Sequence, residues 1–491
     1  MAVPAMFGQS FKTKHDWDYD SEPEPHLNGR TNYLPRGRGL GGTSALNGMV
    51  YVRGHRADFD GWRDLGNAGW GFEDVLPYFA KSEDNAWGAS RLHGAGGPLS
   101  VSDHIYENEI NAAWIDAAAA AGYPRNPDFN GEEQDGVGWY QVTQRNGARW
   151  STAAAFLEPA LERPNLDVIL HALTTRIVIE DRRALGVEIE TAGAAAEVLL
   201  AREVIVSCGA YNSPQLLMLS GIGPVRHLQD MGIECVVDLP VGDGLQDHPG
   251  VFLMFATESH TGRDDRTAEN LELWRTTRTG PLTTNHVQSG GFFRSGPDEP
   301  IPDIQTSVVP TGWSDEGFGL VAGEHFMLLQ WLLRPRSTGT VRLRSPLATA
   351  KPRITHNHLA VEADRRVMAA GLRLNLRIAD HEPIRSHRGA MLRGPSSLGD
   401  DELDRFLRAN VLSAYHATSS CAMGSVVDAR LRVLGIEGLR IADASVMPRI
   451  VGGNTHAAIV MIAEKAADMI KGVGDSATGL AGSDAAPPAS A

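Results

Sequence analysis

The sequence predicts an α/β fold that includes an antiparallel meander. Over residues 204–219, β-branched residues give way to a small-residue turn and then to a helical run, which is the pattern of a strand feeding a helix. Residues 166–207 contain short β-branched runs separated by charged or glycine turns, which predicts an antiparallel meander leading into a core strand. Apolar residues spaced four apart predict a helix over residues 362–379.

Composition places the chain among ordinary globular proteins. It has 491 residues, 42% hydrophobic and 21% charged, a length that suits about three domains or one large interleaved enzyme. No apolar run reaches the length of a spanning helix, so we predict no integral membrane segment. The 60 acidic and 45 basic residues give a net charge of −15, which argues against nucleic acid as a partner. The three cysteines form neither a CxxC pair nor a disulfide framework, so we expect a reducing, cytoplasmic compartment, with which a peripheral position at a membrane is compatible.

The remaining elements follow in chain order. Residues 1–62 are rich in glycine and proline and predict irregular chain without a packed nucleus. Residues 107–121 predict a helix that ends at Gly122. Residues 250–345 are rich in aromatic side chains and show no clean period, so we expect them to build the wall of a pocket.

The C-terminal part predicts a strand, a turn and a helix. LRIADASVMP, which begins at residue 439, is typical of a strand followed by a turn. Residues 456–470 predict a helix with an alanine-rich face and a charged face. Residues 471–491 contain one large apolar side chain and predict a disordered tail.

A glycine-rich segment near the N-terminus matches a nucleotide-binding pattern without its context. GRGLGG, residues 37–42, fits G-x-G-x-x-G, but that fingerprint needs a buried strand before it and a helix after it. The residues before it are Asn-Tyr-Leu-Pro-Arg. We therefore interpret Gly37, Gly39 and Gly42 as a loop whose backbone N–H groups can approach a flat or anionic ligand.

Together with this loop, several motifs make the chain resemble the glucose-methanol-choline (GMC) family of flavin oxidoreductases. The motifs are PRGRGLGGTSALNGMVYVRGHRADFDGW, GAYNSPQLLMLSGIGP, VGDGLQDHP, YHATSSCAMG and LRIADASVMPRIVGGNTHAAIVMIAEKAADMI. The resemblance runs from about Trp17 to Ile470. It implies a Rossmann-like FAD-binding unit assembled from non-contiguous stretches, a substrate-binding unit with an antiparallel sheet, and an enzyme that removes hydride from an alcohol carbon.

The resemblance also divides the chain. It implies an N-terminal, mainly FAD-binding region at residues 1–250, a substrate-pocket region at 251–335 and a C-terminal region at 336–470. Family members begin with a strand, a glycine-rich turn, a helix and a second strand that ends in an acidic residue on the ribose. This chain starts after these elements, so we expect an N-terminally incomplete FAD-binding unit that binds FAD weakly.

Two histidines are the candidates for catalysis. Alcohol oxidation needs a base for the hydroxyl proton, a group that orients the oxygen, and a hydride acceptor that side chains cannot provide. His416 lies in a loop of small residues, and His456 lies at a helix start, where the dipole favours negative charge on a reduced cofactor. By resemblance, His416 matches the catalytic histidine, which we expect to act as the base. His456 takes a position that holds histidine or asparagine in the family.

The resemblance implies a set of FAD contacts. They are Arg36, Gly41, Gly42, Thr43, Asn47 and Gly48 in the first signature, Thr174 near the adenine, and Asp443, Ala444 and His456 toward the C-terminus. Some relatives hold flavin covalently through a histidine just before the asparagine of the first signature. Here that position is Leu46, so we predict non-covalent FAD.

The substrate prediction rests on one difference from the choline-handling members. They carry a glutamate where NHVQSGGFFRS has Gln288. A quaternary ammonium is held by aromatic faces and opposite charge, so losing the carboxylate disfavours choline. We therefore expect a neutral primary alcohol as the small-molecule substrate, and oxygen, a quinone or another carrier as the electron acceptor.

Several alternatives stay open. The chain could be a redox-silent flavin lyase similar to a hydroxynitrile lyase, or a non-catalytic remnant unable to hold FAD. His356 and His358 form an H-x-H pair, but without further ligands in the sequence we predict no metal site. We expect Cys208 and Cys421 to pack as small apolar groups.

Overall fold

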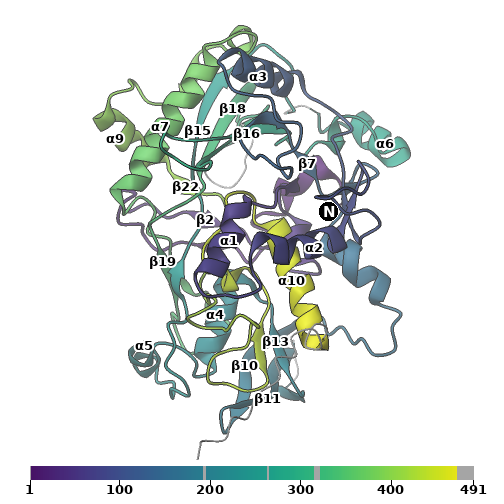
Figure 1. The fold of residues 1–491 in the computed structure, drawn as a ribbon, viewed down its shortest axis with the longest axis vertical. Coiled ribbons are helices and arrows are strands. Elements are labelled where there is room, and N and C mark those ends of the chain that lie inside the picture. Colours follow the sequence, from purple (N-terminus) through teal and green to yellow (C-terminus); the bar gives the residue numbers. More distant parts are fainter. Residues whose placement is uncertain (1, 192–194, 263–264, 314–320, 473–491) are drawn as a thin grey trace, which may run out of the picture.

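The computed structural model describes residues 2–191, 195–262, 265–313 and 321–472, which form two sheet-based parts (Figure 1). The upper part in Figure 1 contains a seven-stranded sheet with helices α3 (Glu109–Ala120) and α7 (Glu362–Ala379). The lower part contains the meander and helix α4 (Gly209–Leu219). Helix α10 (His456–Lys471), yellow in Figure 1, extends from the middle of the molecule toward the meander. The expected combination of an α/β unit and an antiparallel-sheet unit is confirmed.

The seven-stranded sheet is antiparallel throughout. Its order is β21-β15-β18-β17-β16-β6, and β22 also pairs with β15. The strands are β6 (Gly136–Trp139), β15 (Pro249–Ala256), β16 (Ser289–Phe293), β17 (Ile304–Val309), β18 (His325–Leu332), β21 (Met391–Arg393) and β22 (Leu412–Ser413). The sheet draws on chain before, within and after residues 251–335, and the proposed domain boundaries stay a prediction.

Burial on both faces explains why residues 250–345 show no clean period. Alternate residues of β15, such as Val251 and Leu253, pack in one core with α3 and α7. The residues between them, such as Phe252 and Met254, pack on the opposite face with Met327 of β18. Because both faces are apolar, the alternation that marks a half-exposed strand is lost.

The meander is confirmed over most of its predicted length. Strands β10 (Ala172–Glu180), β11 (Arg183–Thr191) and β12 (Glu197–Leu200) pair in antiparallel order. Residues 166–170, which we expected to form its first strand, are irregular, so that part of the prediction is wrong. Leu166 to Leu170 are partly buried or exposed and have no partner strand, which leaves the β-branched pattern without a sheet to support it.

The strand-turn-helix prediction at residue 204 is confirmed. Strand β13 (Val204–Val206) feeds α4 and pairs in parallel with β23 (Leu439–Ile441). This pairing brings the turn before α4 next to the turn after β23. Both turns border the cavity described below.

The predicted helices over 107–121, 362–379 and 456–470 are confirmed as α3, α7 and α10. Asn108 caps α3 by accepting the N–H of Ile110, and α10 ends at Gly472, whose left-handed conformation suits glycine. The other helices are α1 (Arg56–Asp64), α2 (Phe72–Ser82), α5 (Val225–Asp230), α6 (Ala268–Thr277), α8 (Ile384–His387) and α9 (Asp400–Asn410). The short strands are β1 (Tyr19–Asp20), β2 (Tyr33–Leu34), β3 (Val50–Tyr51), β4 (Glu83–Asn85), β5 (Leu99–Val101), β7 (Gln141–Val142), β8 (Gln144–Arg145), β9 (Ala148–Arg149), β14 (Asp243–Leu245), β19 (Gly339–Arg342) and β20 (Arg353–Thr355).

The first 55 residues contain only short elements, but helix α1 begins at Arg56, so the expectation of irregular chain up to residue 62 is wrong there. The segment is also better packed than expected. Tyr19 and Leu34 pair between β1 and β2 and are buried, so the expectation that nothing there could pack is wrong. The segment 37–42 leads into a 3-10 turn rather than an α-helix, which confirms its interpretation as a loop. Only glycine fits at Gly37, because an added Cβ would lie 2.2 Å from the carbonyl oxygen of Gly42.

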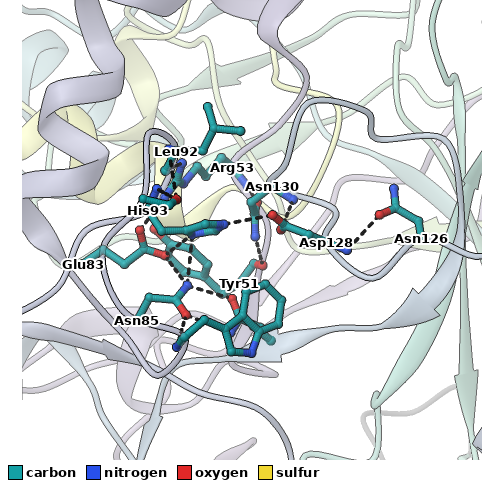
Figure 2. A network of polar contacts seen from close by, with 12 residues as sticks. Tyr51, Arg53, Glu83, Asn85, Leu92, His93, Asn126, Asp128 and Asn130 are labelled. Carbon is teal, nitrogen blue, oxygen red and sulfur yellow. Dashed lines mark hydrogen bonds and ion pairs between the residues drawn. The ribbon is translucent and has the colours of Figure 1, made fainter.

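A buried charged network supports the chain just after this loop (Figure 2). Arg53 pairs with Glu83, and His93 lies between Glu83 and Asp128, with its Nδ1 3.1 Å and its Nε2 2.9 Å from their carboxylates. Two acidic and two basic groups therefore balance in the interior, as buried charges require. The network ties residues 50–54 to two other segments and so fixes the exit of the glycine-rich loop.

Two further expectations concern the tail and the membrane. Of the predicted tail, residues 473–491 lie outside the described residues. Among the helices of the described residues, none is both long and apolar enough to cross a membrane.

Candidate active site

A large cavity is lined by segments from the N-terminal, central and C-terminal parts of the sequence. Its volume is about 940 Å³, at the upper end of small-molecule sites. The glycine-rich loop, the turn before α4, the turn after β23, the loop around His416 and the start of α10 all contribute to its lining. These segments lie far apart in the sequence, and the parallel pairing of β13 with β23 is one reason why they meet.

The cavity collects nearly all of the predicted site residues. They are Arg36, Gly41, Gly42, Thr43, Asn47, Gly48, His416, Asp443, Ala444 and His456. Thr174 does not line the cavity; it lies on β10 opposite Ile189 of β11. The structure therefore brings together the two histidines and the predicted cofactor contacts at both ends of the chain, with Thr174 as the exception among the latter.

The cavity wall has the features of a cradle for a flat, anionic ligand. Side chains are absent where the backbone approaches the space: a Cβ added at Gly39, Gly42, Gly48 or Gly209 would meet no atom within 4 Å. Asp443 shapes one wall, because its carboxylate accepts the N–H groups of Gly209 and Ser445 at 2.8 Å each. Arg36 supplies positive charge from above the Tyr211 ring, 4.7 Å from its centroid. These residues fit FAD.

An inner chamber of about 180 Å³ adjoins the cavity. Its aromatic lining residues are Phe7, Phe11, Phe252, Trp313, Trp331 and Tyr415. Among its described lining residues, none carries a carboxylate. His416 and Asn454 line both spaces, so they lie where a ligand of the cavity and a ligand of the chamber would meet.

Asp247 fixes the loop that carries His416 through two hydrogen bonds. Asp247 Oδ1 accepts the backbone N–H of His416 at 2.8 Å, and its other carboxylate oxygen accepts the Ser413 hydroxyl. Tyr415 has a positive φ of 66°, an uncommon conformation that such contacts have to stabilise. Burial raises the pKa of Asp247 to about 6, against the lowering effect of these hydrogen bonds.

The His416 ring is neutral and bound at both nitrogens. Burial, and then the charge of Arg36, lower the pKa of His416 to about 3. Its Nδ1 lies 3.0 Å from Nδ1 of His248, and its Nε2 lies 3.3 Å from the amide nitrogen of Asn454. A neutral imidazole can accept a proton from an alcohol, and the cavity side of the ring is Nε2.

His456 is the first residue of α10, as predicted. Its Nε2 is buried and has no hydrogen-bond partner within the described residues. Burial and Arg149 lower the pKa of His456 to about 4. An unpartnered polar atom in a cavity wall points to a missing ligand, because such atoms are rarely left unsatisfied.

Sequence reasoning missed two residues that contact His416. Asn454 lies two positions before His456 in GGNTH, and His248 lies in the motif VGDGLQDHP, which was recognised without assigning this histidine a role. The motifs contain both residues, but no periodicity in the sequence shows which side chain turns toward His416.

Gln288 is not where the substrate prediction requires it. It lines neither the cavity nor the inner chamber. Its side chain is fully buried against the start of α3, where Oε1 accepts the N–H of Asn108 and Nε2 donates to the Tyr106 carbonyl. The amide is used to hold a helix N-terminus, so a direct contact between Gln288 and substrate does not fit the structure.

Two further predictions concern the flavin link and a metal site. Leu46 is buried beside Phe7 and Phe11 and offers no nucleophile for a covalent link. His356 and His358 meet Asp247, with one ligand atom from each within 4.8 Å of the others. However, His356 Nε2 already bonds the Tyr211 hydroxyl at 2.9 Å, so we keep the prediction of no metal site.

The two cysteines differ. Cys421 is buried in the apolar core, as expected, and burial raises its pKa. Cys208 lines the large cavity at the N-terminal end of α4, so the expectation that it packs as an apolar group is wrong. The turn before α4 opens toward the cavity instead of toward a core.

The fold and the site define an FAD-dependent oxidoreductase that acts on CH–OH donors. The GMC oxidoreductase family model matches residues 8–250 with its N-terminal domain and residues 335–463 with its C-terminal domain. The chain belongs to the GMC oxidoreductase family. It follows that it takes a small-molecule substrate and passes electrons to an acceptor.

Relatives in this family include choline dehydrogenases. The chain is 41% identical over 472 residues to the mitochondrial choline dehydrogenase of Mus musculus, covering 94% of this chain and 79% of the relative. It is 40% identical over 501 residues to the oxygen-dependent choline dehydrogenase of Brucella anthropi, covering 99% and 90%. Among solved structures, pyridoxine 4-oxidase from Mesorbium loti has a TM-score of 0.88 at 29% identity, covering 96% and 91%. Formate oxidase has a TM-score of 0.88 at 27% identity, covering 97% and 91%.

Proposed function

We propose that this protein oxidises an uncharged primary alcohol, with FAD held non-covalently and His416 as the base. The observation that carries the proposal is the place of His416, whose ring borders both the large cavity and the inner chamber. A catalytic base has to reach the alcohol hydroxyl while the alcohol carbon faces the hydride acceptor. A residue at the junction of the cofactor cavity and the inner chamber, such as His416, meets this requirement.

The proposal gives His416 and His456 different roles at this junction. His416 Nε2 takes the hydroxyl proton, and His456 Nε2, which is buried without a partner, holds the alcohol oxygen. FAD, when bound, supplies the hydride acceptor, so that the alcohol becomes an aldehyde. His416 is neutral before the reaction and carries the proton afterwards, so charge and protons balance.

The cofactor assignment extends to named residues. Arg36, the loop from Gly41 to Gly48 and the turn at Asp443 and Ala444 would hold FAD, and the start of α10 would place His456 beside it. Leu46 supports non-covalent attachment, because its side chain cannot form the bond. Thr174 stays in the proposal as an adenine contact, although it lies outside the cavity lining.

We keep the cytoplasm as the proposed compartment.

The substrate class is supported by the inner chamber. Its aromatic lining suits an apolar or aromatic body, and its described lining residues include no carboxylate for a quaternary ammonium. Aromatic faces alone contribute about 0.5–2 kcal/mol to binding of a cation, which is less than aromatic faces and a carboxylate together. Choline, the substrate in the names of the relatives, is therefore expected to be handled less well than a neutral alcohol.

Anaerobic mixing of the flavin-loaded protein with alcohols tests the proposal. Bleaching of the flavin band by benzyl alcohol or a medium-chain alcohol, with a higher kcat/KM than choline gives, is the expected result. Better saturation by choline would overturn the substrate class. Cyanohydrin cleavage without bleaching would favour a lyase, and a protein that holds no flavin would favour a non-catalytic remnant.

A further inference from the structure

The hydrogen bonds around His416 form a chain whose direction can be followed from one fixed end. The carbonyl oxygen of Thr306 can only accept, and the Tyr140 hydroxyl donates to it at 2.9 Å. Because this hydroxyl has a single proton, its oxygen acts as an acceptor toward its other neighbours. Gln305 Nε2, 3.2 Å away, and Ser307 Oγ, 3.3 Å away, are the donors. Gln305 therefore presents its NH₂ group at this point.

Gln305 in turn fixes the orientation of Asn454. Gln305 Nε2 also donates to Asn454 Oδ1 at 3.1 Å. Asn454 thus turns its amide nitrogen toward His416, 3.3 Å from Nε2. An amide nitrogen donates and cannot accept, so His416 Nε2 is the unprotonated nitrogen of the ring. The orientation of an amide is assigned from its network, and this network starts at a backbone carbonyl, which cannot be reversed.

The other ring nitrogen of His416, Nδ1, contacts His248. A neutral imidazole has one proton, so His416 carries it at Nδ1, 3.0 Å from Nδ1 of His248. The two rings lie at 85°, edge to face. Two nitrogens form a hydrogen bond only when one of them is protonated, so His248 Nδ1 accepts and its own proton lies on Nε2.

The surroundings of His248 agree with this tautomer. His248 is fully buried, and its Nε2 makes no hydrogen bond within the usual distance and angle limits. Burial and then His416 lower the pKa of His248, so this ring is neutral and carries a single proton, while its Nδ1 accepts from His416. The proton of His248 is therefore best placed on Nε2, away from His416.

We propose that this hydrogen-bond chain presets His416 as a base. Gln305 and His248 are the positioning residues that keep the lone pair of His416 Nε2 toward the cavity. The inference rests on the proposed role of His416. Neither Gln305 nor His248 lines the cavity or the inner chamber, so they act through Asn454 and through the His416 ring. An alcohol that takes the place of the Asn454 amide finds a lone pair at Nε2. After His416 has taken up the proton, its Nδ1–H still donates to His248, so the hydrogen bonds need no rearrangement.

The tautomer can be measured directly. In protein labelled with ¹⁵N-histidine, two-bond ¹H–¹⁵N correlation distinguishes a protonated ring nitrogen from an unprotonated one, and a His416→Gln variant assigns the signals. We expect His416 to show a protonated Nδ1 and an unprotonated Nε2 at neutral pH. A protonated Nε2 would overturn the proposal. The measurement needs no turnover, so it gives an answer even if no alcohol is oxidised.

Gln305→Glu tests the direction of the chain. An ionised carboxylate only accepts, so Asn454 has to turn its NH₂ group toward it and its oxygen toward His416, which then needs a proton at Nε2. We expect the flavin reduction rate to fall at least about tenfold, toward the roughly 10⁴-fold loss known for a histidine base in the wrong tautomer. The loss should deepen as pH rises and the introduced carboxyl ionises, while KM changes little.

Gln215→Glu is the matched control for Gln305→Glu. Gln215 is also buried and donates to the carbonyl of Ala350, but it is not part of the hydrogen-bond chain around His416. The control should keep the parental rate and the parental tautomer. A Gln305→Glu protein with the parental tautomer and rate at high pH would overturn the proposal.

His248 is tested by a pair of variants. His248→Phe removes the acceptor for Nδ1–H and should give a mixture of tautomers with a lower rate, whereas His248→Asn offers an oxygen and should recover part of the loss. His286→Phe, at a buried histidine whose Nε2 contacts the Ala5 carbonyl and not His416 or Asn454, controls for lost packing. Equal rates and equal spectra for the two His248 variants would contradict the assignment. If His248→Phe does not fold, the tautomer of the parent protein decides.

Discussion

Gln288 Oε1 accepts the backbone N–H of Asn108, the residue that caps α3, at 2.9 Å. The same side chain donates to the Tyr106 carbonyl, so the amide has both of its functions occupied. Gln288→Glu introduces the glutamate that the family resemblance implies for choline-handling members, yet we expect no gain in kcat/KM for choline, because the side chain reaches neither cavity. It should lower the melting temperature, since an acceptor then faces the Tyr106 carbonyl. Gln288→Met is the control for loss of the hydrogen bonds alone, and a clear gain in choline preference would contradict this expectation.

His416→Ala should lower the rate of flavin reduction by about 10²- to 10⁴-fold, the usual contribution of a positioned base. Binding of the alcohol should change much less, because His416 is only one of many residues that line the chamber. Anaerobic stopped-flow absorbance of the flavin band measures both quantities. A variant reduced at the parental rate would remove His416 as the base.

His456→Asn should cost less than His416→Ala. Asparagine keeps a polar group at the start of α10, where the buried Nε2 of His456 now lacks a partner. His456→Leu, which keeps the bulk without the polar group, is the comparison. The proposed role in holding the alcohol oxygen predicts a larger loss for leucine than for asparagine in the same stopped-flow assay, and equal losses would speak against it.

Gly48→Val should lower flavin occupancy without destabilising the flavin-free protein. A Cβ at Gly48 meets no protein atom within 4 Å, and Gly48 lines both the cavity and the inner chamber, so the new side chain occupies ligand space. Gly296→Val also adds a side chain into open space, but outside both cavities. The ratio of flavin absorbance to protein absorbance after purification, with the melting temperature of the flavin-free forms, gives the comparison. Full flavin occupancy in Gly48→Val would place the cofactor elsewhere.

His93 should make stability depend on pH. Burial lowers its pKa, but hydrogen bonds to Asp128 and Glu83 outweigh this and raise the pKa to about 9. The folded protein therefore holds this proton more tightly than the unfolded chain, whose histidine has a pKa near 6.5. The stabilisation is complete below about pH 6.5, declines above it and is lost as pH rises through about 9.

Urea unfolding at pH 6.5 and pH 9 measures this contribution, on the order of 2 kcal/mol. His93→Gln should flatten the pH dependence. His260→Gln, at an exposed histidine paired with Asp265, should leave it as in the parent, since exposed pairs contribute little. A parent protein whose urea midpoint is the same at both pH values would contradict the assignment.

The sequence predicted much of the fold because long elements carry their own signals. Helix α7 has a periodic apolar face, α3 has an end signal at Gly122, α10 has an alanine-rich and a charged face, and β13 with α4 has a distinctive small-residue turn. The LDVIL run at 166–170 has the same local preference as a strand, but a strand also needs a partner, and no local signal gives the partner. The packing of Tyr19 against the rest of the chain was missed for the same reason.

The site was predicted through motifs, and the errors came where a motif does not fix direction. His416 and His456 lie as expected, because each is tied to a recognisable turn or helix start. The family resemblance suggested a substrate role for Gln288, but its neighbours in space, Asn108 and Asn111, come from a different part of the chain. The roles of Asn454 and His248 depend on which way an amide and an imidazole face, and that follows only from the network of hydrogen bonds.

The seven-stranded sheet has a consequence for how this protein is made. Its edge strand β6 ends at Trp139, and β22 begins at Leu412, so the sheet cannot close until most of the chain has left the ribosome. Until then β6 and β15 expose unpaired, apolar strand edges, which are the surfaces that aggregate during slow, non-local folding. For the same reason a fragment that ends just after β15 lacks β18, the strand that pairs with β15 over seven residues from Gly250 to Ala256, and carries an open edge. Translation speed and chaperone supply, more than the final stability of the fold, should thus control how much of this protein reaches its native form.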